Sequence, residues 1–278
     1  GAADLGNTLH GVQISGGASG NTIGGTAWGA GNLISGNDRL GVLITGSGTT
    51  GNVVQGNSVG TSLDGNGALG NSLSGFQISG GASGNTIGGT AWDAGNLISG
   101  NGHLGVLITG SGTTGNVVQG NRVGTRRDGN GALGNSLHGV QISSSASDNV
   151  IGGTYVGVGN QISGNVQSGV FISGATNNLV QGNLIGTDAA GTGGLANGQN
   201  GVQISGSGAT GNTVGGSVAG AGNVISGNTG VGLVISQSAS ENVVSANLIG
   251  TDVSGTADLG NGTFGVLLST AFNNTLGG

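Results

Sequence analysis

The chain has no cysteine, proline, methionine or lysine, and aromatic residues make up only 3% of its 278 positions. Without cysteine it forms no disulfide and offers no thiol for catalysis or metal binding. Only four basic residues, all arginine, stand against ten acidic ones, and the formal net charge is −6. Binding to nucleic acid needs a basic face that neutralises phosphates, so the composition argues against a nucleic-acid partner.

Long apolar runs are also missing. No stretch of eighteen apolar residues occurs, which predicts that the chain does not insert into a membrane. The first residues lack the basic and apolar segments of a signal peptide and resemble residues 257–265 instead. We therefore expect the sequence to begin inside a repeat and to be a segment of a longer array, with any targeting signal outside it.

Glycine is abundant, at 70 residues, and in a sequence without periodicity this level would indicate disorder. Here a signature recurs every 30 to 34 residues: glycine, an apolar residue, any residue, Ile or Leu, then Ser or Thr. It begins at Gly11, Gly41, Gly75, Gly105, Gly139, Gly169, Gly201, Gly232 and Gly265. A repeat of this length predicts a solenoid or a propeller, and its continuity predicts a single domain over residues 1–278.

Each repeat contains three short β-branched runs separated by glycine-rich bends. In the first repeat the expected strands cover residues 11–15, 21–25 and 32–36; in the second they cover 41–45, 52–56 and 57–61, followed by a longer excursion over 63–73. Period-two alternation places Val12, Ile14, Ile23 and Ile34 in the interior. Stacked coils rise about 4.8 Å each, so eight coils predict a rod of roughly 40 Å.

Asparagine opens the second and third run of almost every repeat. The two sets are Asn21, Asn52, Asn85, Asn116, Asn149, Asn178, Asn212, Asn242 and Asn274, and Asn32, Asn57, Asn96, Asn121, Asn160, Asn183, Asn223 and Asn247. Asparagine tolerates left-handed backbone, and its amide both donates and accepts hydrogen bonds. We therefore predict two structural asparagine ladders along the rod.

The segments GNLISGN, GVLITGSGTTGNVVQGN and NLIGTDAAGT resemble the β-helix repeats of large bacterial secreted and surface proteins. These repeats are akin to the carbohydrate-binding and sugar-hydrolase β-helix superfamily. The resemblance covers the whole chain and implies an all-β, right-handed parallel β-helix (solenoid) with three short strands per coil and about eight to nine coils. It also implies an extracellular or cell-surface location.

Residues 10–73 and 74–137 are near-identical copies that differ at eight positions. Apart from Val12/Phe76 in the first run, the changes fall mainly at bends, and three of them introduce Arg122, Arg126 and Arg127. Duplication of a whole two-coil unit suits a function that scales with length, and suits a single active site poorly.

Candidate catalytic groups are sparse. The chain has one glutamate, and the recurring aspartates Asp64, Asp128, Asp188 and Asp252 follow the third run, where aspartate caps turns well. Their carboxylates could ligate a weakly bound calcium ion, but the sequence lacks the remaining ligands of a calcium-binding loop. The three histidines have no zinc-ligand spacing, and we interpret them as exposed bend residues. No cofactor is expected.

The outward positions of the first run form a more informative column. Its members are Gln13, Leu43, Gln77, Leu107, Gln141, Phe171, Gln203, Val234 and Leu267, beside a second column of serine and threonine. This neutral face, with Gln13, Gln77, Gln141 and Gln203 as its amides, suits a polysaccharide or a neighbouring rod. Trp28 and Trp92 occupy equivalent bends about 10 Å apart, where they could stack on sugar rings or simply cover a corner of the coil.

We therefore predict a structural or adhesive rod of an extracellular bacterial protein that contacts polysaccharide through this neutral face, rather than an enzyme. The alternative is a polysaccharide lyase or glycoside hydrolase of the β-helix type. A third hypothesis, an ice-binding protein, is weakened by the lack of a regular Thr-x-Thr array. Unpaired strand edges at both ends also predict end-to-end association, and the neutral face would permit lateral association.

Overall fold

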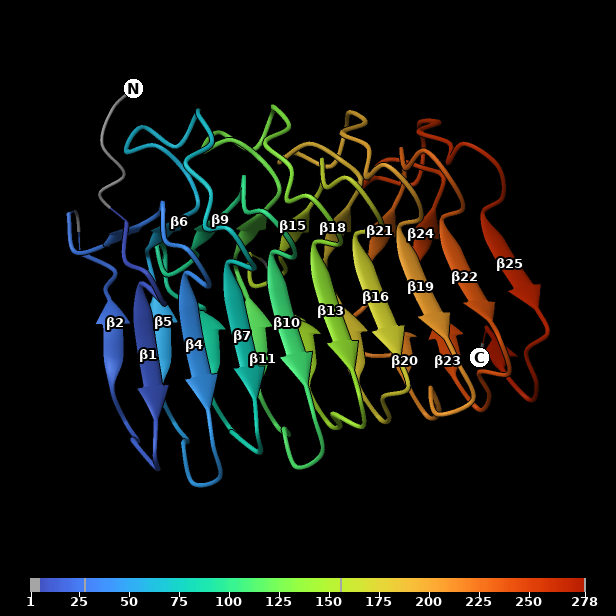
Figure 1. Cartoon of the computed structure of the whole chain (residues 1–278). Coiled ribbons are helices and arrows are strands. Elements are labelled where there is room, and N and C mark those ends of the chain that lie inside the picture. Colours follow the sequence, from blue (N-terminus) through green and yellow to red (C-terminus); the bar gives the residue numbers. More distant parts are fainter. Residues whose placement is uncertain (1–5, 28, 156, 278) are drawn as a thin grey trace.

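The computed structural model describes residues 6–27, 29–155 and 157–277. The chain winds through three parallel sheets in turn and gives one strand to each sheet in each of the first eight coils; the last coil gives β25 and β26 to two of them (Figure 1). This is the right-handed parallel β-helix that the repeats predict, and each coil pairs with the coil before and after it. No helix able to cross a membrane occurs among the described residues.

The strands of a coil are four, three and two residues long, slightly shorter than expected from the sequence. Sheet 1 contains β1 (Val12–Ser15), β4 (Val42–Thr45), β7 (Phe76–Ser79), β10 (Val106–Thr109), β13 (Val140–Ser143), β16 (Val170–Ser173), β19 (Val202–Ser205), β22 (Leu233–Ser236) and β25 (Val266–Ser269). Sheet 2 contains β2 (Thr22–Gly24), β5 (Val53–Gln55), β8 (Thr86–Gly88), β11 (Val117–Gln119), β14 (Val150–Gly152), β17 (Leu179–Gln181), β20 (Thr213–Gly215), β23 (Val243–Ser245) and β26 (Thr275–Leu276). Sheet 3 contains β3 (Leu33–Ile34), β6 (Ser58–Val59), β9 (Leu97–Ile98), β12 (Arg122–Val123), β15 (Gln161–Ile162), β18 (Leu184–Ile185), β21 (Val224–Ile225) and β24 (Leu248–Ile249).

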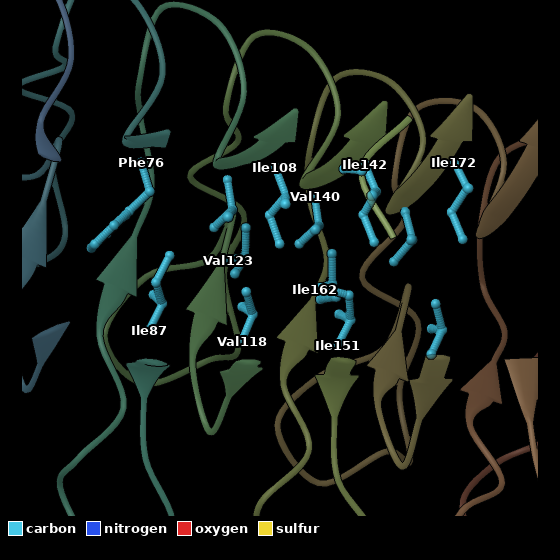
Figure 2. Close-up of a cluster of buried hydrophobic side chains, with 14 of the residues drawn as sticks. Phe76, Ile87, Ile108, Val118, Val123, Val140, Ile142, Ile151, Ile162 and Ile172 are labelled. Carbon is cyan, nitrogen blue, oxygen red and sulfur yellow. The ribbon is translucent and has the colours of Figure 1, made fainter. Parts of the chain in front are cut away.

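The interior is a stack of aliphatic side chains, four strand residues from each coil. In one central coil these are Val106 and Ile108 from β10, Val118 from β11 and Val123 from β12, all fully buried. Each lies directly above its counterpart in the next coil, as Ile108 does above Ile142, so the side chains form continuous columns (Figure 2). Burial of each such side chain contributes about 1.5–3 kcal/mol, and this apolar stack drives the coiling.

The two predicted asparagine ladders are confirmed. Asn85 shows the pattern: its backbone N–H and Nδ2 both donate to Oδ1 of Asn116 in the next coil, at 3.0 and 3.1 Å. Nδ2 also donates to the carbonyl of Thr49 in the preceding coil. Every donor and acceptor of the buried amide is therefore used, which removes the cost of burying it.

A third ladder, absent from our expectations, runs along the corner before sheet 1. It consists of Asn7, Asn37, Asn71, Asn101, Asn135, Asn165, Asn197, Asn228 and Asn261, linked from coil to coil by side-chain amides. The sequence contains its signal, because an asparagine lies four residues before the glycine that opens each sheet 1 run. All three corners of the coil are thus tied in the same way.

Long loops cover the outer face of sheet 3. In the second coil the loop returns across this face, where Thr61 bridges Ala68 in antiparallel fashion. Some outward side chains of the sheet are buried beneath such loops, as Leu97 and Gln161 are at 6% exposure each, whereas Arg122 stays exposed. The outer faces of sheets 1 and 2 have no such cover along most of their length, since their outward residues keep intermediate exposure. The outer faces of sheets 1 and 2 are therefore the long uncovered sheet surfaces of the rod.

Replacing one central ladder residue should destabilise the whole rod. In the variant Asn116→Ala, the amides of Asn85 lose their acceptor, and the carbonyl of Ala82 loses its side-chain donor. We expect the free energy of unfolding to fall by roughly 3 kcal/mol, measured by urea denaturation. The control Asn66→Ala changes an exposed loop asparagine and should cost less than about 1 kcal/mol. Equal losses in the two variants would contradict the structural role of the ladder.

Candidate functional site

The outer face of sheet 1 carries the predicted column of glutamines and apolar residues. The register confirms it: Gln77 pairs with Leu43 on one side and Leu107 on the other, and Gln141 pairs with Leu107 and Phe171. Gln13 is exposed, and Gln77, Gln141 and Gln203 keep intermediate exposure. The glutamines recur every second coil, a spacing of about 10 Å along the rod.

Hydroxyl groups beside the glutamines are largely paired with one another. Ser79 Oγ donates to Thr45 Oγ1 at 3.2 Å, and the same bond recurs between two other coils, from Ser143 to Thr109. Gln77 Nε2 donates to Ser79 Oγ, which leaves its carbonyl oxygen available. The side-chain amide of Gln141 makes no hydrogen bond to any described residue. The face thus presents amide groups to a ligand, whereas most of its hydroxyls are hydrogen-bonded within the rod.

The predicted residues fall on two separate surfaces. Trp92 lies in the bend between sheets 2 and 3, away from the glutamine column, and its side chain is 91% exposed. The alternative that it covers a corner of the coil is therefore wrong. Trp28 lies outside the described residues. Sequence reasoning missed Tyr155, which is 80% exposed in the corresponding bend two coils later. Tyr155 lies one residue before the position that aligns with Trp92, so it does not line up with the tryptophans in the repeat.

His138 is not an exposed bend residue, contrary to expectation. It is 9% exposed, its ring lies 4.7 Å from that of Phe171, and its Nδ1 accepts the backbone N–H of Ser168 at 3.1 Å. Burial lowers its pKa to about 4, and the Ser168 bond requires an unprotonated Nδ1. His103 is exposed, as predicted.

Three other residues do the same work as His138 at equivalent positions. Nδ1 of His10, Oγ of Ser74 and Oδ1 of Asn200 each accept a backbone N–H from the next coil. These side chains have a structural role, since each accepts a backbone N–H of the next coil, and any side chain with a suitable acceptor atom can take the position. The histidines therefore need no catalytic explanation.

The recurring aspartates cap their own turns. Asp64 accepts from Ser62 Oγ and from the N–H of Asn66, and these bonds hold the pKa of its carboxyl below the usual value. Asp128 accepts the N–H of Asn130. Both carboxylates therefore act as acceptors within their own turns.

The later aspartates occupy a position two residues earlier in the loop than Asp64 and Asp128. Asp188 and Asp252 stand at the position of Ser62, and Asp252 Oδ1 accepts the N–H of Ala257 much as Ser62 Oγ accepts that of Gly67. Serine and aspartate are thus interchangeable turn acceptors in this loop. Among the residues described, no three His, Asp or Glu side chains gather where they could hold a metal ion.

The structural role of His138 predicts a dependence on pH. Its folded pKa lies below the unfolded value of 6.5, so its contribution to stability is complete above pH 6.5 and is lost as pH falls towards 4. His138→Ser supplies the residue found at position 74 and should remove this contribution. We expect wild type to lose more stability than the variant between pH 7.5 and 4.5, measured by urea midpoints. Parallel losses would contradict the assignment.

Comparison with known proteins identifies the fold. No protein-family model matches the sequence, and no curated protein matches it either. The structure is similar to the crystal structure of the periplasmic alginate epimerase AlgG, with a TM-score of 0.56 and 16% identity, over 85% of this chain and 47% of that one. Two single-substitution variants of that enzyme give TM-scores of 0.53 and 0.51 at 16% and 14% identity. This chain therefore spans about half the length of these structures, and what it shares with them is the right-handed parallel β-helix.

Proposed function

We propose that this chain is a rigid extracellular or cell-surface rod that binds polysaccharide through the outer face of sheet 1. The observation that carries the proposal is the repetition of one neutral surface, glutamine alternating with an apolar residue, along the first eight of the nine paired strands of sheet 1. Each contact is weak, but a polymer that spans several coils engages many of them at once. Affinity would then grow with the length of the rod, as the duplicated two-coil unit also suggests.

The chemistry of the face suits sugars. Amide groups such as that of Gln141 donate to and accept from hydroxyls, and the intervening Leu107 and Phe171 offer apolar surface to the faces of sugar rings. The similar solved structures belong to an enzyme whose named substrate, alginate, is a polysaccharide, and whose named location is the periplasm. Both facts support a carbohydrate ligand and a location outside the cytoplasm.

Trp92 adds a second contact in this proposal. Its exposed ring lies on the bend between sheets 2 and 3, and Tyr155 projects from the corresponding bend two coils further on. An exposed aromatic ring presents a flat apolar surface with no partner of its own. We assign these rings, with Trp28 at the equivalent first position, to sugar stacking separate from the sheet 1 face.

A pair of matched variants tests the sheet 1 face. Gln77→Ala with Gln141→Ala removes two amides from sheet 1, and Gln55→Ala with Gln119→Ala removes two from the outer face of sheet 2. At about 1 kcal/mol per hydrogen bond, the first pair should weaken retention on a neutral polysaccharide about five- to thirtyfold. The second pair should leave it unchanged.

Affinity electrophoresis through gels containing xylan, dextran, mannan or alginate would measure this, with calcium and with chelator. Equal effects of the two pairs would remove sheet 1 from the proposal. Release of shortened or unsaturated products from any of these polymers would favour the lyase or hydrolase alternative instead.

Self-association of the 278-residue chain forms part of the proposal. The ladders are directional, because each asparagine donates to the next coil and accepts from the previous one. At the first coil, Oδ1 of Asn21 and Asn32 accepts from no described residue; at the last, the backbone N–H groups of Asn247 and Asn274 donate to none. The two end faces are thus complementary, and unpaired strand edges at both ends add backbone groups to the match.

Charge placed on one end face should prevent this association. Leu276 lies in the last strand of sheet 2 and is 49% exposed. We expect sedimentation velocity to show association of wild type that rises with protein concentration, and Leu276→Arg to remain monomeric. The control Leu63→Arg places arginine on a side loop, where Arg127 stands in the duplicate unit, and should associate like wild type. A monomeric wild type at all concentrations would refute the proposal.

A further inference from the structure

Three of the four arginines gather on one side of the rod. Arg122 belongs to β12 in sheet 3, and Arg126 and Arg127 begin the loop that follows it. All three side chains are exposed. In a chain with a formal charge of −6, such a group is a local reversal of the overall charge.

The loop does not need these arginines for its shape. The duplicate unit carries Ser58, Ser62 and Leu63 at the same three positions and builds the same turn. The N–H of Ser62 donates to the carbonyl of Gly67 at 2.7 Å, and the N–H of Arg126 donates to that of Gly131 at the same distance. The two copies thus differ in surface chemistry and share their backbone hydrogen bonds.

The three arginines have different surroundings. Arg127 is an anchor: its Nε donates to the carbonyl of Asp64 at 3.1 Å, and its Nη2 donates to Ser58 Oγ at 2.9 Å, both in the duplicate unit. Arg122 and Arg126 donate no side-chain hydrogen bond to any described residue. Asp128 directly follows Arg127 in the sequence. Its carboxylate accepts the N–H of Asn130 and forms no ion pair within the described chain. Two guanidinium groups therefore remain available to a ligand.

These two guanidinium groups flank one short turn, residues 129–131. A Cβ built on Gly129 would lie 3.2 Å from Arg122 Nε, and one built on Gly131 would lie 3.2 Å from Arg126 Nε. Gly129 has a φ of 75°, which L side chains rarely adopt, so this position stays without a side chain. The backbone of this turn therefore lies between the guanidinium groups of Arg122 and Arg126.

A buried acceptor without a donor faces the same turn. Gln161 pairs in register with Arg122 of the preceding coil, and its Nε2 donates to the carbonyls of Gly129 and Thr187. Its Oε1 is the only buried side-chain polar atom without a partner in the part of the chain that the structure describes. The Cβ position of Gly129 lies 2.5 Å from this oxygen. The Gln161 acceptor and the Arg122 guanidinium therefore both lie next to Gly129.

We propose that Arg122, Arg126 and Gln161 form a binding site for an acidic sugar of a carboxylated polysaccharide. Guanidinium groups pair with carboxylates through charge-assisted hydrogen bonds, and the Gln161 oxygen accepts a hydroxyl of the same ring. An acidic sugar carries both groups on one ring. This site is independent of the neutral sheet 1 face.

The duplicate unit supplies the variants for the test. Arg122→Ser with Arg126→Ser restores the residues of positions 58 and 62 and keeps the anchor Arg127, so the fold should persist, as an unchanged thermal midpoint would show. We expect oligogalacturonate to bind wild type, by calorimetry at low salt, and to bind this variant at least tenfold more weakly. Gln161→Leu, which supplies the residue of positions 97 and 184, should weaken binding severalfold.

Arg39→Ser is the matched control, because it removes an exposed positive charge outside the group. It should bind oligogalacturonate like wild type. The proposal is overturned if wild type does not bind, if Arg39→Ser loses as much affinity as the double variant, or if inorganic phosphate or duplex DNA binds more tightly than oligogalacturonate.

Discussion

The hydrogen bond from one corner asparagine to the equivalent asparagine of the next coil is the interaction on which this structure depends. It uses the backbone N–H and the side-chain amide of one residue and the carbonyl oxygen of the next. Because the two residues must be equivalent, the bond fixes a one-to-one register between coils. Glycine beside the ladder is part of the same constraint: a Cβ on Gly88 would lie 1.9 Å from the carbonyl of Gln119.

Three such ladders leave the outer surface free to vary. The interior needs only β-branched aliphatic residues, and the corners need asparagine and glycine, so outward residues contribute little to the register. This explains how residues 10–73 and 74–137 keep one backbone while the second copy acquires three arginines. A rod of this kind can carry a neutral face on sheet 1 and a basic group beside sheet 3 without conflict between them.

The parts of the fold that follow from local repetition were predictable. Strand order, the alternation that buries Val42 and Ile44, and two of the three ladders can all be read from the spacing of residue types. The third ladder has an equally regular spacing before the sheet 1 strands, but its asparagines follow the sheet 3 strands at variable distances, in loops of unequal length. Turn capping by Asp64 was also expected, since aspartate makes that bond within a few residues of itself.

Other features depended on contacts between coils. His138 looked like a bend residue, and only the stacking of Phe171 and the amide of Ser168 from the following coil made it a buried acceptor. Trp92 looked able to cover a corner, but no neighbouring coil reaches it. The sequence by itself determined the β-helix, its coil length and its interior, because a period of one coil repeats the same local choices. Only the tertiary structure decided which outward residues are covered and which acceptors lack donors, because the pairing of β12 with β15 and the loop folded over them bring Arg122, Gln161 and Gly129 together.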